Sequence, residues 1–188
     1  MNIVIRFFVI LFMLHFFACS KTNQFRIAEN YLGLITSKTT IAEIENIFKN
    51  DSVVKHLSEG VLGYKGVYFQ EDDKYLIYAK GGKHLLTITP KDPLDSLSTV
   101  RCIDIFDSRY VTKDGVGINT AFEDINSHYK IGKIETTFTS VILFLDQLNA
   151  TITLKKKDLG IQTHEMTPIK PERIPNVIKP SLLTLWFD

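Results

Sequence analysis

Apolar residues with helical spacing occur in two segments of the chain. In each segment they are separated by three and then four residues, which places them on one face of a helix. A glycine and a threonine precede each segment, with the glycines at Gly33 and Gly115. We therefore expect two short helices in related sequence units. The matching apolar sets, at an offset of 81, are Ile41, Ile44 and Phe48, then Phe122, Ile125 and Tyr129.

Both predicted helices begin with a threonine that is followed three residues later by a glutamate. The pairs are Thr40 with Glu43 and Thr120 with Glu123. This spacing is typical of a capping box, in which the hydroxyl and the carboxylate accept hydrogen bonds from free N–H groups of the first turn. We interpret the two glutamates as helix caps and not as catalytic acids.

Two runs of β-forming residues follow each helical segment, as expected for a hairpin. The first hairpin combines residues 75–79 and 85–89, with a turn at Gly81-Gly82. The second hairpin combines residues 141–145 and 151–154. The sequence therefore predicts one antiparallel hairpin in each unit.

A last strand ends each unit after a connection that contains proline. Residues 102–107 match residues 183–188 at an offset of 81. The connections are residues 90–99 and 160–181, and the second contains four prolines. Because proline interrupts helices and central strands, we expect neither in the second connection.

These elements predict an α+β fold with two tandem helix–strand–strand–strand repeats, at residues 33–111 and 112–188. Antiparallel strands form one sheet about a pseudo-twofold axis, or two small sheets, with the helices packed on one face. A β-rich stretch at residues 61–69 precedes the first hairpin, and a short strand lies around residues 25–28. The architecture resembles tandem α+β modules of small secreted bacterial lipoproteins and of secreted inhibitor proteins.

The first residues of the chain form a different pattern. Arg6 precedes an apolar run at residues 7–17, and a small residue, Ala18, follows it. This order is typical of a secretory signal peptide, which we place at residues 1–18. The run of eleven residues is shorter than the roughly 20 that a helix needs to span a bilayer. An uncleaved membrane anchor remains the alternative.

The end of this signal, Phe16-Phe17-Ala18-Cys19, resembles the lipobox of bacterial lipoproteins. The resemblance implies that Cys19 becomes the first mature residue and carries acyl chains such as palmitate, which attach the protein to a membrane. Residues 19–32 then form a linker with a short strand. A serine directly after the lipidated cysteine, here Ser20, resembles lipoproteins that are sent to the outer membrane. We therefore expect the protein at the outer membrane, facing the periplasm. The alternative is a signal cut elsewhere, with Cys19 incidental.

Charge and cysteine content exclude several classes of protein. Of 22 basic residues only Arg6 lies in the signal, so the mature chain has 21 basic and 21 acidic residues and no electrostatic pattern for nucleic acid. We expect the run Lys155-Lys156-Lys157 to be a solvated turn. With Cys19 lipidated, Cys102 has no partner for a disulfide, and we expect it to be a small buried residue.

Residues suited to catalysis form no known constellation. The mature chain has histidines at His56, His84, His128 and His164, without the spacing of a metal site, and it lacks the Gly-x-Ser-x-Gly pattern of a hydrolase nucleophile. We therefore predict no catalytic residue, no metal and no cofactor, and expect the histidines at the surface.

An aromatic-rich span gives the one candidate binding surface of the sequence. Aromatic residues in strands usually pack across a sheet, and this is the interpretation we favour. If they are exposed, they form a surface for a partner or a sugar. The residues of this possible surface are Tyr64, Tyr68, Tyr75 and Tyr78.

Three functional hypotheses follow from the sequence. The leading one is a lipid-anchored envelope protein without catalytic activity, with an envelope protein or a glycan as its partner. The second is an envelope hydrolase with an unfamiliar site that uses His84, His164 or Glu165. The third is a carrier of an apolar ligand, which needs a cavity between sheet and helices. A solid core would argue against the carrier, and its expected members are Ile41, Ile44, Phe122, Ile125 and Trp186.

Overall fold

The computed structural model describes residues 24–58, 72–167 and 169–187. The predicted signal peptide, the lipidation site Cys19 and the β-rich stretch at residues 61–69 lie outside the described residues. The candidate surface residues Tyr64 and Tyr68 also lie outside them.

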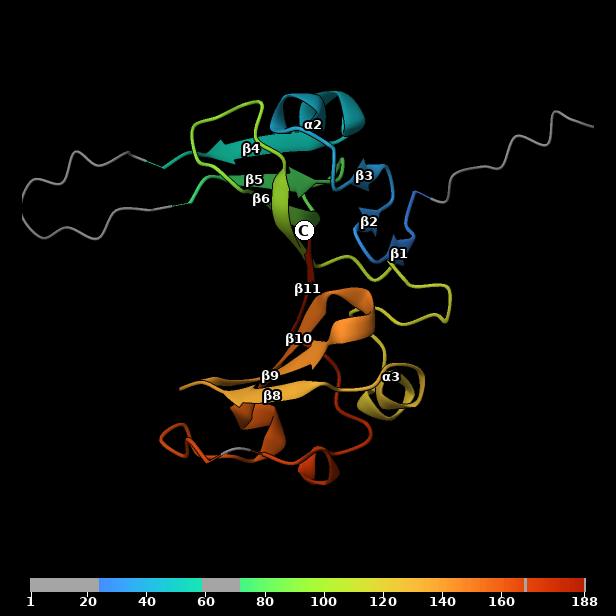
Figure 1. The fold of residues 1–188 in the computed structure, drawn as a ribbon, viewed down its shortest axis with the longest axis vertical. Helices are drawn as coiled ribbons and strands as arrows, with labels where there is room; N and C mark the ends of the chain where they lie inside the picture. Colours follow the sequence, from blue (N-terminus) through green and yellow to red (C-terminus); the bar gives the residue numbers. More distant parts are fainter. Residues whose placement is uncertain (1–23, 59–71, 168, 188) are drawn as a thin grey trace, which may run out of the picture.

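The described chain has an α+β fold with mostly antiparallel sheets (Figure 1). A small sheet of three strands has the order β1-β2-β3, and a sheet of eight strands has the order β4-β5-β6-β7-β11-β10-β9-β8. The strands are β1 Ile27–Ala28, β2 Tyr31–Leu32, β3 Ile35–Thr36, β4 Ser52–His56, β5 Lys74–Tyr78, β6 His84–Pro90, β7 Val100–Ile105, β8 Lys133–Thr136, β9 Ser140–Leu145, β10 Ala150–Lys155 and β11 Leu182–Trp186. The helices are α2 Ile41–Ile47 and α3 Phe122–His128, with short 3-10 turns η2 Asp146–Leu148, η3 Lys156–Leu159 and η4 Pro171–Arg173.

The central pair of the large sheet is β7 and β11, which joins the strands from the two parts of the chain. In this antiparallel pair Asp104 lies opposite Thr184, and Ile105 lies opposite Leu183. The Thr184 hydroxyl donates a hydrogen bond of 2.7 Å to the Asp104 carboxylate. The predicted strands of both units therefore share one sheet, with β4–β6 at one end of Figure 1 and β8–β10 at the other.

The predicted cap of the first helix is confirmed and that of the second is wrong. The Glu43 carboxylate accepts from the backbone N–H of Thr40 at 2.8 Å, and the Thr40 hydroxyl accepts from the backbone N–H of Glu43, which completes the capping box. Helix α3 instead begins after Ala121. The Thr120 hydroxyl accepts from the backbone N–H of Gly117 at 2.9 Å. The Thr120 hydroxyl therefore stabilises the turn before the helix and does not form the predicted cap with Glu123.

Both helices receive their first hydrogen bonds from the connection that precedes the last strand of the unit. The first two N–H groups of a helix have no partner within it, so carbonyl oxygens from elsewhere stabilise its start. The proline-rich connection before β11 thus has a structural role although it lacks regular helix or strand. The bonds are Ile41 N to Ser98 O 3.0 Å, Ala42 N to Ser96 O 2.9 Å, Phe122 N to Ile178 O 2.8 Å and Glu123 N to Asn176 O 3.0 Å.

The core lies between the helices and one face of the large sheet. Ile103 and Leu185 face each other across the central pair and have no exposed surface. The buried side chains of α2, α3 and the small sheet belong to the same cluster. Side chains alternate along a strand, so Trp186 points to the opposite face, and it is 38 % exposed. The expectation that Trp186 lies in the core is therefore wrong. The offset of 81 also matches Ile105 with Trp186, and this match is wrong because Ile105 is fully buried.

The expected solvated turn at residues 155–157 contains a fully buried lysine. Lys156 donates hydrogen bonds from Nζ to the carbonyl oxygens of Thr163, at 3.0 Å, and Glu165, at 2.6 Å. A buried ammonium group is tolerated when its donors are satisfied. The prediction for this run is therefore wrong at Lys156, which ties η3 to the following loop.

Candidate functional site

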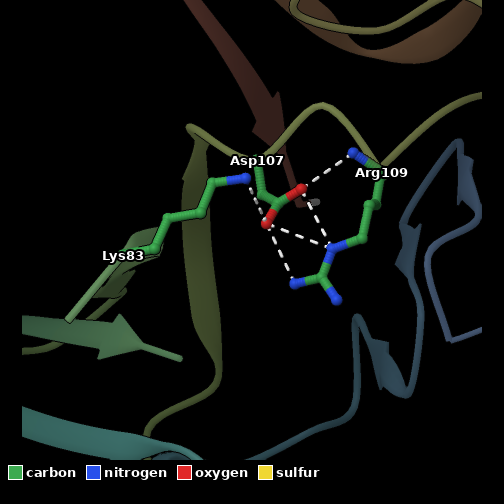
Figure 2. Close-up of polar contacts among 3 residues, drawn as sticks. All are labelled: Lys83, Asp107 and Arg109. Carbon is green, nitrogen blue, oxygen red and sulfur yellow. Dashed lines mark hydrogen bonds and ion pairs between the residues drawn. The ribbon is translucent and has the colours of Figure 1, made fainter. Parts of the chain in front are cut away.

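A buried carboxylate lies just beyond the end of β7. The side chain of Asp107 has no exposed surface and accepts hydrogen bonds from two cations. Arg109 donates to it from Nε, at 3.1 and 3.2 Å, and from Nη2, at 2.9 Å, and Lys83 Nζ lies 3.1 Å away (Figure 2). The backbone N–H of Arg109 also donates to Asp107, at 2.9 Å, which closes a tight local turn.

These contacts decide the ionisation of Asp107. Burial alone would raise its pKa, but the hydrogen bonds from Arg109 and Lys83 outweigh burial and lower the pKa from 3.8 to about 2. Asp107 is therefore an anion at any physiological pH. A group that does not exchange its proton near neutral pH is unsuited to general acid or base catalysis.

The arginine of this cluster also holds the start of the described chain. The Arg109 guanidinium lies 4.3 Å from the centroid of the Phe25 ring, a cation–π contact. Phe25 packs edge to face on Tyr110, with centroids 5.2 Å apart. The backbone of Val111 donates to the Phe25 carbonyl at 3.0 Å and accepts from Ile27 at 2.9 Å. The segment before β2 is thus attached to the body by stacking and by backbone bonds.

A cleft of about 230 Å³ lies at this junction between the small sheet, the end of α2 and the Asp107 cluster. Arg109 is occupied by Asp107, and burial raises the pKa of Tyr110, so that its phenol stays neutral. The cleft is smaller than the roughly 300–1,000 Å³ of typical ligand pockets. It is lined by Gln24, Phe25, Leu32, Leu34, Ile47, Phe48, Asn50, Asp51, Leu85, Arg109 and Tyr110.

A second cleft, of about 380 Å³, lies where residues 26–29 meet the end of α3. Its polar lining includes Arg26, Lys113 and Asp114, and the Tyr129 hydroxyl donates to Asp114 at 3.1 Å. The segment that begins at Gln24 therefore contributes to both clefts.

Of the aromatic residues predicted as a possible surface, the structure describes Tyr75 and Tyr78, and these two do not form one exposed surface. Tyr75 is buried in the core, so the structure contradicts its place in an exposed surface and confirms the packing role. Tyr78 is half-buried and stacks on His84, with centroids 4.9 Å apart. On its other side His84 stacks on Phe106, with centroids 4.2 Å apart.

The residues of the hydrolase hypothesis lie on different elements. His84 begins β6, and its Nε2 lies 3.0 Å from the Thr87 hydroxyl and 3.0 Å from the carbonyl of Leu86. His164 and Glu165 lie in the connection between β10 and β11. Within the part of the chain that the structure describes, no hydrogen bond or ion pair joins His84 to them, and no three metal-binding side chains gather.

Sequence reasoning missed the Asp107 cluster. The only local signal is an Asp two residues before an Arg, which is common in turns and has low specificity. Lys83 joins the cluster only because the turn at Gly81-Gly82 brings it beside the end of β7. For Cys102, by contrast, the prediction is confirmed, because the thiol is buried and burial raises its pKa.

Comparison with known proteins gives a likeness of fold. No protein-family model and no curated protein matches the chain. The structure is similar to the crystal structure of the uncharacterized protein yfeY from Escherichia coli, with a TM-score of 0.57 and 16 % sequence identity. The similarity covers 86 % of this chain and 99 % of that chain. Among the described residues, no helix is long and apolar enough to cross a membrane.

Proposed function

We propose that this chain is a lipid-anchored protein of the bacterial cell envelope that binds a partner and has no catalytic activity. The observation that carries the proposal of binding is the state of the ionisable groups beside the first cleft. Asp107 is held as an anion by Arg109 and Lys83, and Tyr110 is held as a neutral phenol. Groups held in one protonation state near neutral pH are unsuited to proton transfer, which favours binding over catalysis at this cleft.

The proposed anchor is Cys19 within the lipobox-like sequence, and the outer membrane, facing the periplasm, is the proposed location. The first described residue, Gln24, follows Cys19 by five residues and lines the first cleft. This short spacing supports a folded body held close to the membrane surface. An envelope protein or a glycan is the proposed partner.

We further propose that the fold arose from two tandem repeats, each with one helix and four strands. Matched contacts support the duplication. The hydroxyl of Thr39 accepts from the N–H of Thr36 at 3.0 Å, as the hydroxyl of Thr120 does from Gly117. The carbonyl groups that bond the first N–H groups of α2 and α3 are at matched positions, 80 residues apart.

The location is tested by comparing the full chain with its Cys19→Ala variant, both expressed in a Gram-negative host. We expect the wild-type chain in the membrane fraction, with an N-terminal peptide that begins at Cys19 and has added acyl mass. The variant should lose this mass and leave the membrane fraction, while Cys102→Ala serves as the matched control. A wild-type chain that keeps Met1, or that has an unmodified Cys19, would contradict the anchor.

A further inference from the structure

A pocket of about 340 Å³ lies beside Trp186, at the end of β9 and the start of β10. Trp186 is 38 % exposed, and Phe144 contributes a second aromatic ring to the lining. The pocket is separate from the two clefts at the N-terminal segment. Its size lies within the range of small-molecule sites. It is lined by Phe144, Leu145, Asp146, Asn149, Ala150, Thr151 and Trp186.

The indole ring of Trp186 is held in place by polar contacts. Its Nε1 donates to the Thr151 hydroxyl at 3.1 Å, and its backbone N–H donates to the carbonyl of Asn149 at 2.8 Å. An exposed ring with a fixed orientation loses little conformational entropy when a ligand stacks on it. Trp186 is thus a preformed platform.

The other part of the sheet shows what such a platform accepts. The backbone N–H of Phe106 donates to the carbonyl of Leu85 at 2.9 Å, the same contact that Trp186 makes with Asn149. The imidazole of His84 is stacked on Phe106, with an interplanar angle of 24°. At Trp186 the structure has a pocket. The geometry therefore favours a ligand whose ring can stack on the face of the indole.

Polar groups of the pocket select among such ligands. Asn149 has an amide nitrogen that is buried and has no hydrogen-bond partner. An unsatisfied buried donor destabilises the free pocket, and rotation of the amide toward a ligand acceptor would satisfy it. Asp146 is exposed and offers carboxylate acceptors, and its carboxylate packs over Gly132, where a Cβ would displace it.

We propose that this pocket binds a pyranose saccharide, whose apolar C–H face stacks on Trp186. Its hydroxyl groups donate to Asp146, and a ring, hydroxyl or acetamido oxygen accepts from Asn149. A purely apolar ligand would leave the amide donor unpaired and would desolvate the carboxylate, which disfavours it. The inference goes beyond the proposed function, because it places a glycan at a surface that is separate from the first cleft.

The chain has one tryptophan, so its fluorescence reports on this pocket directly. The full chain in detergent micelles is titrated with three probes: the trimer of N-acetylglucosamine, maltotriose and cellotriose. We expect a saturable change of Trp186 emission with at least one of them. Asn149→Asp should weaken that binding about tenfold, the effect of losing one hydrogen bond worth about 1.4 kcal/mol. Asp tolerates the left-handed backbone of residue 149, whose φ is 49°.

Two further variants complete the test. Trp186→Leu should abolish binding measured by calorimetry, whereas Phe106→Leu, the matched ring of the first unit, should leave it unchanged, with far-UV circular dichroism as the check of folding. The proposal is overturned if no saccharide changes the emission up to about 50 mM, above the range of weak binding. It is also overturned if Asn149→Asp binds as tightly as the wild type. Neither result bears on the lipid anchor at Cys19, which the membrane-fraction experiment tests. Failure of the saccharide proposal can therefore be distinguished from failure of the proposed location.

Discussion

Two buried charged residues, Asp107 and Lys156, are stabilised in different ways. Asp107 is paired with cations, so its contribution to stability depends on ionisation. Lys156 donates to neutral carbonyl groups of the chain. Burying a charge is costly unless its hydrogen bonds are satisfied, and both residues meet this condition. Asp107 thereby connects the end of β7 to the turn that contains Lys83, and Lys156 connects η3 to the following loop.

The lowered pKa of Asp107 predicts a loss of stability in acid. The folded pKa is about 2 and the ordinary value is 3.8, so the unfolded chain binds the proton more readily. The contribution is fully present above pH 4 to 5 and is lost as the pH falls through 2. Its size is about 2 kcal/mol, from the shift in pKa.

Asp107→Asn tests this expectation by urea denaturation between pH 7 and pH 2. We expect the variant to lower the free energy of unfolding by about 2–3 kcal/mol at pH 7, and by much less near pH 2. Asp158→Asn, at an exposed position, is the matched control and should change stability little at either pH. A destabilisation by Asp107→Asn that is the same at both ends of the range would contradict the assignment.

At the scale of elements, the turn between β2 and β3 fixes the position of the N-terminal segment. Gly33 has a φ of 61°, a left-handed conformation that favours glycine, and its N–H donates to the carbonyl of Arg26 at 2.9 Å. A Cβ on this residue would overlap the carbonyl oxygen of Gln24. Glycine is therefore required at this position for two independent reasons, the left-handed backbone and the close approach to the carbonyl of Gln24.

Gly33→Ala should detach residues 24–28 from the body. We expect a loss of about 3 kcal/mol or more, because strain from the left-handed backbone adds to the overlap. Gly115→Ala is the matched control: φ is 79° but a Cβ there would meet nothing within 4 Å, so about 1–2 kcal/mol is expected. Hydrogen exchange of the Ile27 amide, which bonds Val111, should accelerate only in Gly33→Ala. Equal effects of the two variants would show that overlap has no role.

Elements with strong local patterns are the ones that sequence predicts well. The spacing of Ile41 and Ile44 predicts α2, because both residues face the core. Strands β4 and β8 are absent from the prediction because they lie at the sheet edges, where short, polar strands show little alternation. The Asp107 cluster also escaped prediction, since Lys83 reaches it only through the pairing of distant strands. Long-range contacts of this kind leave no periodic signal.

At the scale of the molecule, the continuous sheet predicts one cooperative unfolding transition. The two parts of the chain share the β7–β11 pair and one hydrophobic cluster, so neither can lose its structure alone. Trp186 fluorescence and far-UV circular dichroism should therefore give the same urea midpoint.

The Leu185→Ala variant gives a second test of a single cooperative unfolding transition. Leu185 is fully buried in β11, and its truncation should cost about 2–5 kcal/mol. Both signals should shift to the same lower midpoint. Leu97→Ala, at a residue 74 % exposed, is the control and should change little. Two separate transitions in the circular dichroism signal would contradict a single cooperative unit.

The order of the large sheet has a consequence for how the molecule avoids self-association. An open sheet ends in two strands with unpaired backbone groups, which can template a strand from another chain. Among the strands that the structure describes, the ends are β4 and β8, and each carries a lysine, Lys55 or Lys133. Lys55 pairs with Glu45 of α2 at 2.7 Å, and Lys133 pairs with Glu135. A strand added at either edge would have to desolvate these charges, which is energetically costly. The charges on β4 and β8 therefore oppose growth of the sheet into fibrils.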